Sequence, residues 1–431
     1  MLRVAFLLSL AFCYAVARHE QYKGYVLYEV EVANEQQAQE VQALRNIPGI
    51  DMWSIATPSR PGYTLVPGPL RIFFESEVVG AGAKFKIEVE DVVEMLKKED
   101  ELLTAAEMRS NSTNGRLSFD VIHRYAAVDA YLVDLARRHS TVTAVSGGRS
   151  FEGRDIKYLK ISTTNFQNTR KPIIFIQSLL HAREWVTLPA ALYAIRKLVV
   201  DITDRDLVDN IDWIILPIAN PDGYEFSQTR TRFWRKNRST GHIIGNVCQG
   251  VDLNRNFDIN WGTLSSNAPC SDTFHGRAAF SEPETAIVRN ILQEYRSRIE
   301  MFLDVHSFGS MILYGYGTGE LPPNALSLNT AGVRMARAID AVKWASKPNY
   351  RVGNSALVLN YRDSGSANDY GQAIGIPFAY TYELPAYRNQ ANSLNGFLVD
   401  PDFIEQAGRE TWEGIKAGAR FVLQHSSRNK H

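Results

Sequence analysis

The chain has 431 residues, of which 45% are hydrophobic and 22% are charged, so it is long enough for a large core and for more than one domain. This composition is ordinary for a globular protein and excludes a disordered or fibrous one. The 47 basic and 47 acidic residues cancel, which argues against nucleic acid or an anionic membrane as a partner, because both require a large positive field.

The first 17 residues are predicted to be a secretion signal. They contain the basic residue Arg3, the apolar stretch VAFLLSLAFCYAV and the small-residue ending Ala15-Val16-Ala17, an order typical of a cleaved signal peptide. The apolar stretch is too short to span a membrane, and the polar C-terminal residues SSRNKH do not resemble an anchor. We therefore expect a secreted, extracellular protein.

The cysteine count agrees with secretion. Of the three cysteines, Cys13 would be removed with the signal. Cys248 and Cys270 then remain as an even pair in an oxidising compartment, which predicts one disulfide. Two free buried thiols are the alternative.

Residues 18–108 are predicted to form a small α+β domain. Within it we expect a strand at residues 25–32, a helix at 34–44 capped by Asn34, a strand at 68–75 and an amphipathic helix at 89–103.

The stretch RSNSTNGR, residues 109–116, is polar, contains glycine and has an arginine at each end. Such a stretch is exposed and sensitive to proteases. A plain domain linker is the simplest interpretation, but arginines at both ends, after a secretion signal, favour a segment that is cut to activate a zymogen. The stretch also carries a glycosylation sequon at Asn111.

Residues 117–431 alternate strands with helices. Strands are predicted at 172–180, 212–220, 301–308 and 377–384, and helices at 188–202 and at 402–423, where Trp412, Ile415, Ala419 and Val422 share one face. This order predicts an α/β fold with a mixed, mostly parallel central sheet and helices on both faces. Ligands of such sheets bind at the strand ends, which is where His181, His306 and Glu383 fall.

The cluster HARE suggests a metal site. His181 and Glu184 are three residues apart just beyond a predicted strand, so they can direct an imidazole and a carboxylate toward one point, and His306 can supply a third ligand. Two histidines and one carboxylate with an open fourth position form a catalytic zinc site rather than a structural one. The spacing alone is a weak signal, since a surface histidine near a glutamate, or a satisfied core histidine, explains most such matches.

Six sequence blocks in a fixed order strengthen the zinc interpretation. They are HAREW, NPDGYEFSQTRTRFWRKNRS, GVDLNRNFD, APCSDTFHG, HSFGSMILYGYG and YTYEL. In content and order these blocks resemble those of the zinc metallocarboxypeptidases, the pancreatic and insect digestive carboxypeptidase A/B family. The resemblance covers residues 117–425, and the preceding domain resembles the inhibitory propeptide of that family. It implies one Zn²⁺ per chain and hydrolysis of the C-terminal peptide bond of peptides and proteins.

The resemblance implies a role for each residue that matches a family motif. It gives the zinc ligands as His181, Glu184 and His306, the general base as Glu383, the oxyanion-stabilising arginine as Arg235, and the substrate-binding residues as Arg183, Asn254, Arg255 and Tyr361. Asp252 matches a residue that orients a zinc histidine, and Cys248 and Cys270 match the family's disulfide. A second sequon begins at Asn237, two residues after Arg235, so we expect it to be unmodified.

The specificity pocket departs from the family pattern. At the pocket floor the A type usually has an apolar residue and the B type an aspartate, whereas this chain has Asn368. Asn368 offers no charge to a terminal Lys or Arg, but Asp363 occupies a pocket-wall position that is usually small. We expect A-like release of neutral, aliphatic or aromatic residues, with B-like release of Lys or Arg as the alternative. Phe308 replaces a tyrosine of the vertebrate enzymes, which removes a hydroxyl from the outer subsites.

Two other classes of function match part of the pattern. One is a secreted, inactive binding protein that keeps the fold, but no ligand or base is missing here. The other is a zinc amidase acting on acyl-amino acids, against which stand the propeptide-like domain and the NRN and WRK blocks. We expect a monomer, because nothing in the sequence requires a partner subunit. The expected partners are an activating trypsin-like protease and proteinaceous carboxypeptidase inhibitors.

Overall fold

The structure, a computed structural model, describes residues 18–110, 117–243, 245, 247–389 and 394–425. Residues 1–17, predicted to be the secretion signal, and residues 111–116 of the predicted activation segment lie outside the described residues. The described residues divide into two compact units, one of residues 18–100 with Phe226–Phe233 and one of residues 101–225 with the chain from Trp234 onward. The predicted domain boundaries stay a prediction.

The first unit contains a four-stranded antiparallel sheet with strand order β2-β3-β1-β4. Its elements are β1 (Val26–Glu31), α2 (Glu35–Ala43), β2 (Asp51–Ser54), β3 (Gly62–Val66), α3 (Arg71–Gly80), β4 (Lys84–Val89) and short 3-10 turns at Glu20–Tyr22, Leu44–Asn46 and Gly68–Leu70. Helix α4 (Val92–Ser110) crosses the division between the units. Asn34 caps α2 as predicted, accepting a hydrogen bond from the Gln37 N–H at 3.0 Å.

The strand predicted at residues 68–75 is wrong, because this segment forms a 3-10 turn and then helix α3. Phe74 and Val78, four residues apart, are buried in the core of the unit, whereas Ile72 and Phe73 are exposed. One buried stripe at a spacing of four is the pattern of a helix, and Pro69 lacks the N–H that a sheet ladder would use.

The second unit is built on an eight-stranded sheet with strand order β11-β10-β12-β9-β7-β8-β6-β5. Its strands are β5 (Val142–Arg149), β6 (Asp155–Ile161), β7 (Ile173–Ser178), β8 (Asp212–Leu216), β9 (Ile299–Ser307), β10 (Met311–Tyr314), β11 (Arg351–Asn354) and β12 (Phe378–Leu384). Four of the seven strand pairings are parallel, so the sheet is mixed and mostly parallel, as predicted.

The structure describes further elements after the first unit's sheet. They are α5 (Tyr125–Arg138), α6 (Thr187–Val199), α7 (Arg205–Asn210), α8 (Pro221–Thr229), a 3-10 turn at Leu253–Arg255, α9 (Pro283–Glu294), α10 (Ala325–Asp340), α11 (Ser355–Leu359), α12 (Ala367–Ala373), β13 (Tyr387–Asn389), β14 (Leu394–Gly396) and α13 (Pro401–His425). Helix α8 crosses the division between the units.

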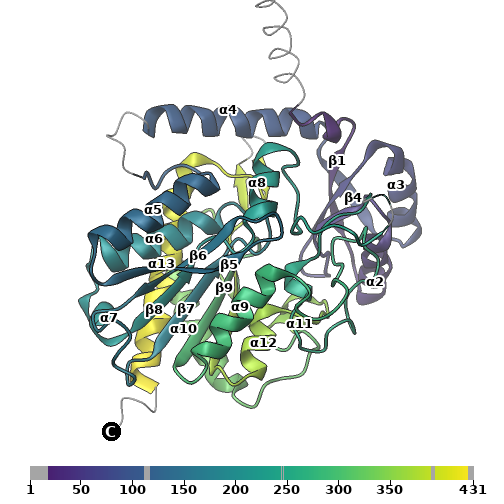
Figure 1. The fold of residues 1–431 in the computed structure, drawn as a ribbon. Helices are drawn as coiled ribbons and strands as arrows, with labels where there is room; N and C mark the ends of the chain where they lie inside the picture. The colour runs from purple at the N-terminus through teal and green to yellow at the C-terminus, as the bar shows by residue number, and fades with distance from the viewer. Residues whose placement is uncertain (1–17, 111–116, 244, 246, 390–393, 426–431) are drawn as a thin grey trace, which may run out of the picture. The chain divides into compact units, whose positions relative to one another are not determined.

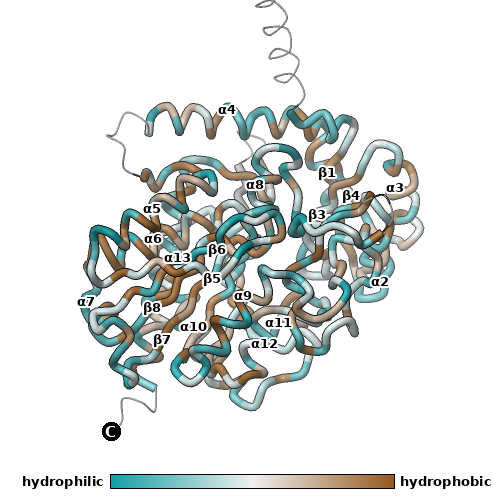
Figure 2. Tube along the Cα trace, in the orientation of Figure 1, coloured by the Kyte–Doolittle hydropathy of each residue, from teal (hydrophilic) through white to brown (hydrophobic). Residues whose placement is uncertain are grey.

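Helices cover both faces of the large sheet, as Figure 1 shows for α6 and α13 on one side and α9 and α12 on the other. Phe175 of β7 packs in one core cluster with Ile291 of α9 and Tyr370 of α12. On the opposite face, Trp213 of β8 meets Trp412 of α13 with ring centroids 6.0 Å apart. Burial on both faces explains the continuous hydrophobic runs along β7 and β8 in Figure 2.

No helix in the described part of the chain combines the length and the apolar character that crossing a membrane requires.

Candidate functional site

The metal-ligand candidates meet at one edge of the large sheet. Strands β7 and β9 run parallel and pair directly, so their carboxyl ends lie at the same edge. His306 is near the end of β9, and His181 and Glu184 lie in the turn between β7 and α6. Thr187 fastens this turn, with its hydroxyl donating to the Glu184 carbonyl at 2.8 Å.

Three ligand atoms converge in this cluster. His181 Nδ1 lies 2.8 Å from one Glu184 carboxylate oxygen, and His306 Nδ1 lies 2.9 Å from the other. The two Nδ1 atoms are 3.0 Å apart, and all three residues are buried. Burial alone would raise the pKa of Glu184, but the two histidines outweigh it and lower the pKa below its usual range. The structure thus brings together the three residues that the sequence singled out.

The outer nitrogen of each histidine faces a second carboxylate. His181 Nε2 lies 3.1 Å from Asp252 Oδ1, and His306 Nε2 lies 2.8 Å from Asp304 Oδ2. A carboxylate beside Nε2 favours a proton on that nitrogen, which leaves the Nδ1 lone pair available to a metal. Two imidazole nitrogens and one carboxylate are the donor set of a catalytic zinc. The residues therefore fit a zinc ion.

Asp304 is a site residue that the sequence reasoning missed. Its Oδ1 accepts a hydrogen bond of 2.7 Å from Gln177 Nε2, and both residues are fully buried. The available signal was the sequence DVH, because Asp304 and His306 are two residues apart on one strand and so share a face.

Arg235 is tied to the same framework through Asp252. Its Nε and Nη2 donate to Asp252 Oδ2 at 3.2 and 3.0 Å, while the other oxygen faces His181. Burial alone would raise the pKa of Asp252, but Arg235 and His181 outweigh it, so the pKa lies well below its usual range. Asp252 therefore stays ionised and connects a candidate ligand with a cation beside it.

Glu383 lies next to the metal-ligand candidates on the neighbouring strand. It is in β12, directly opposite His306 in the parallel ladder with β9. Its Oε2 atom is buried and has no hydrogen-bond partner within the described part of the chain. Burial raises the pKa of Glu383 to about 7, against the lowering effect of His306. A carboxyl poised in this range can exchange a proton near neutral pH.

The residues assigned to the substrate's terminal carboxylate gather around Arg255. The Tyr361 side chain hydrogen-bonds the Arg255 guanidinium, and Asp363 pairs with it at 2.8 Å. The amide of Asn254 contacts His306 Nε2 at 3.4 Å on one side and accepts from the Ala367 N–H at 2.8 Å on the other. Asn254 thus links this group to the metal-ligand candidates.

Asn368 and Arg183 are buried too. Asn368 Nδ2 donates to Asp369 Oδ1 at 3.1 Å. Burial, with a contribution from Asp363, raises the pKa of Asp369 to about 7. The Arg183 guanidinium lies over the ring of Phe397 at 4.3 Å, and Phe397 packs against Phe308 at 4.9 Å between centroids. Phe308, where the vertebrate enzymes have a tyrosine, therefore contributes its ring to an aromatic contact beside Arg183.

The segment after Arg235 is anchored by buried hydrogen bonds. Asn237 is fully buried, and its Nδ2 donates to Glu282 at 2.7 Å and to Glu284 at 3.0 Å. Because this nitrogen is the atom that a glycan would modify, the geometry agrees with our expectation of an unmodified sequon.

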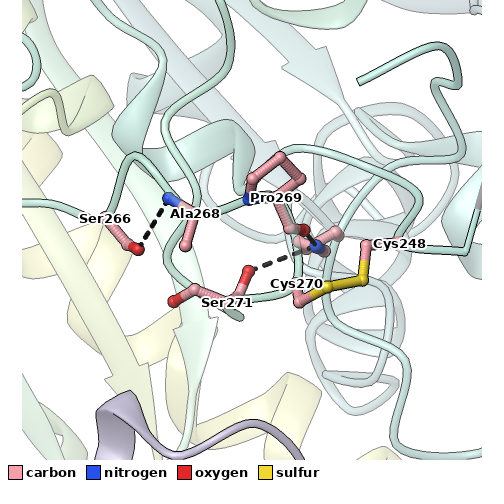
Figure 3. The surroundings of a disulfide bond; sticks show 7 residues. Cys248, Ser266, Ala268, Pro269, Cys270 and Ser271 are labelled. Atoms are coloured by element: carbon pink, nitrogen blue, oxygen red, sulfur yellow. Dashed lines mark hydrogen bonds between the residues drawn. A yellow bond between two sulfur atoms is a disulfide. The ribbon is translucent and has the colours of Figure 1, made fainter. Parts of the chain in front are cut away.

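The predicted disulfide between Cys248 and Cys270 is present, with Cα atoms 4.8 Å apart (Figure 3). Lys236, which follows Arg235, donates from Nζ to the carbonyls of Pro269 at 2.8 Å and Ser271 at 3.1 Å. These carbonyls flank Cys270, so the disulfide loop and the Arg235 segment are joined by a buried ammonium.

Comparison with known proteins gives consistent matches. A family model described as zinc carboxypeptidase matches residues 128–414. A carboxypeptidase B of Helicoverpa zea is 46% identical over 96% of this chain and 98% of its own. The crystal structure of a carboxypeptidase A from Helicoverpa armigera has a TM-score of 0.92 and 59% identity, over 95% of this chain and 100% of that one.

A bovine thrombin-activatable fibrinolysis inhibitor, solved in complex with a tick carboxypeptidase inhibitor, is 26% identical with a TM-score of 0.64, over 71% of this chain and 99% of that one. The family match and the identities confirm the resemblance that the sequence motifs indicated. The chain belongs to the zinc carboxypeptidase family and is a hydrolase.

Proposed function

We propose that the chain is the zymogen of a secreted carboxypeptidase that carries one zinc ion and releases neutral, aliphatic or aromatic residues from peptide C-termini. The observation that carries the proposal is a grouping of three parts: the metal-ligand candidates, a Glu383 oxygen opposite His306 that has no partner among the described residues, and the buried Arg255, whose neighbour Asn254 contacts His306. A carboxypeptidase needs these three parts.

Arg255 binds the C-terminal carboxylate of the substrate. An exopeptidase must bind a free carboxylate, and the planar guanidinium fork of arginine pairs with a carboxylate through two N–H groups. Asn254 and Tyr361 lie beside Arg255 and are polar groups that suit the same carboxylate. This placement fixes the last peptide bond near the metal-ligand candidates, because Asn254 contacts His306.

The chemical step requires a base and an anion-stabilising cation. A bound zinc supplies a water of lowered pKa and polarises the carbonyl. Glu383 takes a proton from the attacking water and returns it to the leaving amine nitrogen. Arg235, oriented by Asp252, donates hydrogen bonds to the oxygen that becomes negative in the transition state.

The A-like preference is supported by the charges around the pocket. Asn368 is neutral, and Asp363 is already paired with Arg255, so neither offers an uncommitted charge to a terminal Lys or Arg. The alternative is B-like release. Asp363→Ala should then lose activity selectively on peptides ending in Lys or Arg, whereas under our proposal activity on peptides ending in Phe is retained.

The zymogen proposal gains support from the first compact unit. Phe226–Phe233, which ends two residues before Arg235, belongs to the same unit as residues 18–100. Within this unit Arg232 donates to both oxygens of Glu99 at 2.7 and 3.0 Å, and both side chains are 1% exposed. Cleavage near Arg109 or Arg116 by a trypsin-like protease would separate the N-terminal module from the enzyme. Uncut protein as active as cut protein would refute the inhibitory role.

Secretion and partners complete the proposal. Residues 1–17 support export, and the chain would act as an extracellular monomer. Proteinaceous carboxypeptidase inhibitors are proposed partners, because a bovine family member is bound by one from a tick.

The central experiment measures release of the last residue from matched peptides ending in Phe, Leu, Lys and Glu, before and after trypsin and with and without a zinc chelator. We expect chelator-sensitive release that begins only after trypsin and favours Phe and Leu. Glu383→Gln should lower kcat at least about 10²-fold while zinc remains bound, with exposed Glu320→Gln as the matched control. A zinc-loaded protein that cleaves none of the peptides would overturn the proposal.

A further inference from the structure

We propose that Asp363 sets the affinity for the substrate's terminal carboxylate by competing with it for Arg255. The inference rests on the role of Arg255 in the proposed function. Asp363 Oδ2 lies 2.8 Å from Arg255 Nη2, and the two side chains are only 17% and 7% exposed. The Asp363 carboxylate thus pairs with the same guanidinium that would bind the substrate's terminal carboxylate.

The loop that carries Asp363 is fixed against the segment that carries Arg255. The Phe257 N–H donates to the Gly365 carbonyl at 3.0 Å, and the Gly365 N–H donates to the Ile259 carbonyl at 3.0 Å. Gly365 has φ +79°, and a Cβ there would lie 2.4 Å from the Arg255 carbonyl oxygen. Glycine therefore permits the close approach of the two backbones. The ion pair is a consequence of this rigid packing.

A second glycine makes room for the Asp363 carboxylate. The Asp363 N–H donates to the Gly317 carbonyl at 3.0 Å. A Cβ on Gly317 would lie 2.0 Å from Asp363 Oδ1. Any side chain at Gly317 would thus fill the space that the carboxylate occupies, so the fold accommodates this acid in the orientation that faces Arg255.

The charge of Arg255 is stabilised mainly by Asp363. Burial by itself would lower the pKa of Arg255, but Asp363, followed by Tyr361, raises it above its usual range. Arg255 Nη1 donates to the Asn254 carbonyl at 2.7 Å, and the buried Nε has no partner among the residues that the structure describes. A terminal carboxylate that binds through two N–H groups must share Nη2 with Asp363 or displace it.

The consequence is weaker binding of every C-terminal carboxylate, both in substrates and in the released product. The effect acts on ground-state affinity, so it raises KM and hastens product release without contributing to the chemical step. A carboxylate at a pocket-wall position also disfavours a terminal residue whose own side chain is acidic, because two like charges would face each other.

The test is a calorimetric titration of the trypsin-treated full chain with 3-phenylpropionate and with its neutral amide, 3-phenylpropanamide. Asp363→Asn keeps the shape and a hydrogen-bond acceptor but removes the charge. We expect Asp363→Asn to bind 3-phenylpropionate about tenfold more tightly than the wild type does, and to bind 3-phenylpropanamide equally. Glu320→Gln removes an exposed charge nearby and should match the wild type. KM for a peptide ending in Phe should fall by a similar factor with kcat retained.

The outcomes separate this inference from the proposed function. Tighter 3-phenylpropionate binding by Asp363→Asn without peptide cleavage by either protein would keep the inference and overturn the function. Cleavage with unchanged 3-phenylpropionate affinity, or no binding by either protein, would overturn the inference, because freeing Arg255 must improve a carboxylate site. Asp363→Ser, which also lacks the charge, replaces Asp363→Asn if the latter fails to fold.

Discussion

At the scale of single residues, the two candidate ligand histidines are oriented in the same way. Asp252 faces Nε2 of His181, and Asp304 faces Nε2 of His306. An ionised carboxylate can only accept a hydrogen bond, so beside a neutral imidazole it favours the tautomer with its proton on Nε2. The metal affinity of the site therefore depends on two residues that do not touch the metal.

We predict that Asp304→Asn lowers zinc affinity by about 10- to 100-fold. An Asn amide can donate to His306 Nε2, which would move the imidazole proton to Nδ1 and remove the lone pair that a metal needs. Zinc retained during a graded titration with a chelator measures the effect, and Asp258→Asn, at an exposed position, is the control. Equal retention of zinc by the wild type and Asp304→Asn would contradict the tautomer argument.

At the scale of elements, a buried lysine joins the segment of Arg235 to the disulfide loop. Lys236 is 4% exposed, and its Nζ donates to two carbonyls beside Cys270. Burial lowers the pKa of Lys236, while the nearby Asp272 acts in the opposite direction. Replacing this ammonium would leave two carbonyls without their donor and loosen the support of the arginine.

Lys236→Met should lower the free energy of unfolding by about 1–3 kcal/mol and lower kcat more than it changes KM. The reason for the split is that Arg235 acts on charge that develops only in the transition state. Denaturant titrations and steady-state kinetics measure the two effects, and Lys236→Arg, which keeps a donor, should recover part of both. A loss of stability with kcat intact would show that Lys236 does not position Arg235.

Elements differ in how well the sequence predicts them. Strands β7, β8, β9 and β12 were predicted because burial on both faces makes them short apolar runs. Helix α3 was mistaken for a strand because PLRIFF is equally apolar, and only the burial of Phe74 and Val78 distinguishes the two patterns. The grouping of the metal-ligand candidates could be predicted because they follow the ends of neighbouring strands. The Asp363–Arg255 pair could not, because it depends on the direction of the Asp363 side chain and on the space that Gly317 leaves for it.

At the scale of the whole molecule, several carboxyl groups outside the metal-ligand cluster are buried, and their ionisation there costs free energy. Burial raises the pKa of Glu284, Asp369 and Glu410 to about 7 in each case. In the unfolded chain such groups ionise near pH 4. Between these values the folded state binds more protons through these groups, so their contribution to stability is most favourable below the unfolded pKa and falls as pH rises toward 7.

Glu410 offers the clearest test of this linkage. It is fully buried on α13, and Glu410→Gln removes its titration while keeping its shape. The free energy of unfolding of Glu410→Gln relative to the wild type should rise by about 1.4 kcal/mol per pH unit between pH 5 and pH 7. In this range Glu410 of the wild type is ionised in the unfolded chain but protonated in the folded state, whereas a glutamine does not titrate. Urea titrations of the full chain at each pH measure the difference, with exposed Glu405→Gln on the same helix as the control. Parallel pH profiles for the wild type and Glu410→Gln would mean that Glu410 ionises in the folded state as readily as in the unfolded chain, and that burial on α13 does not hold its proton.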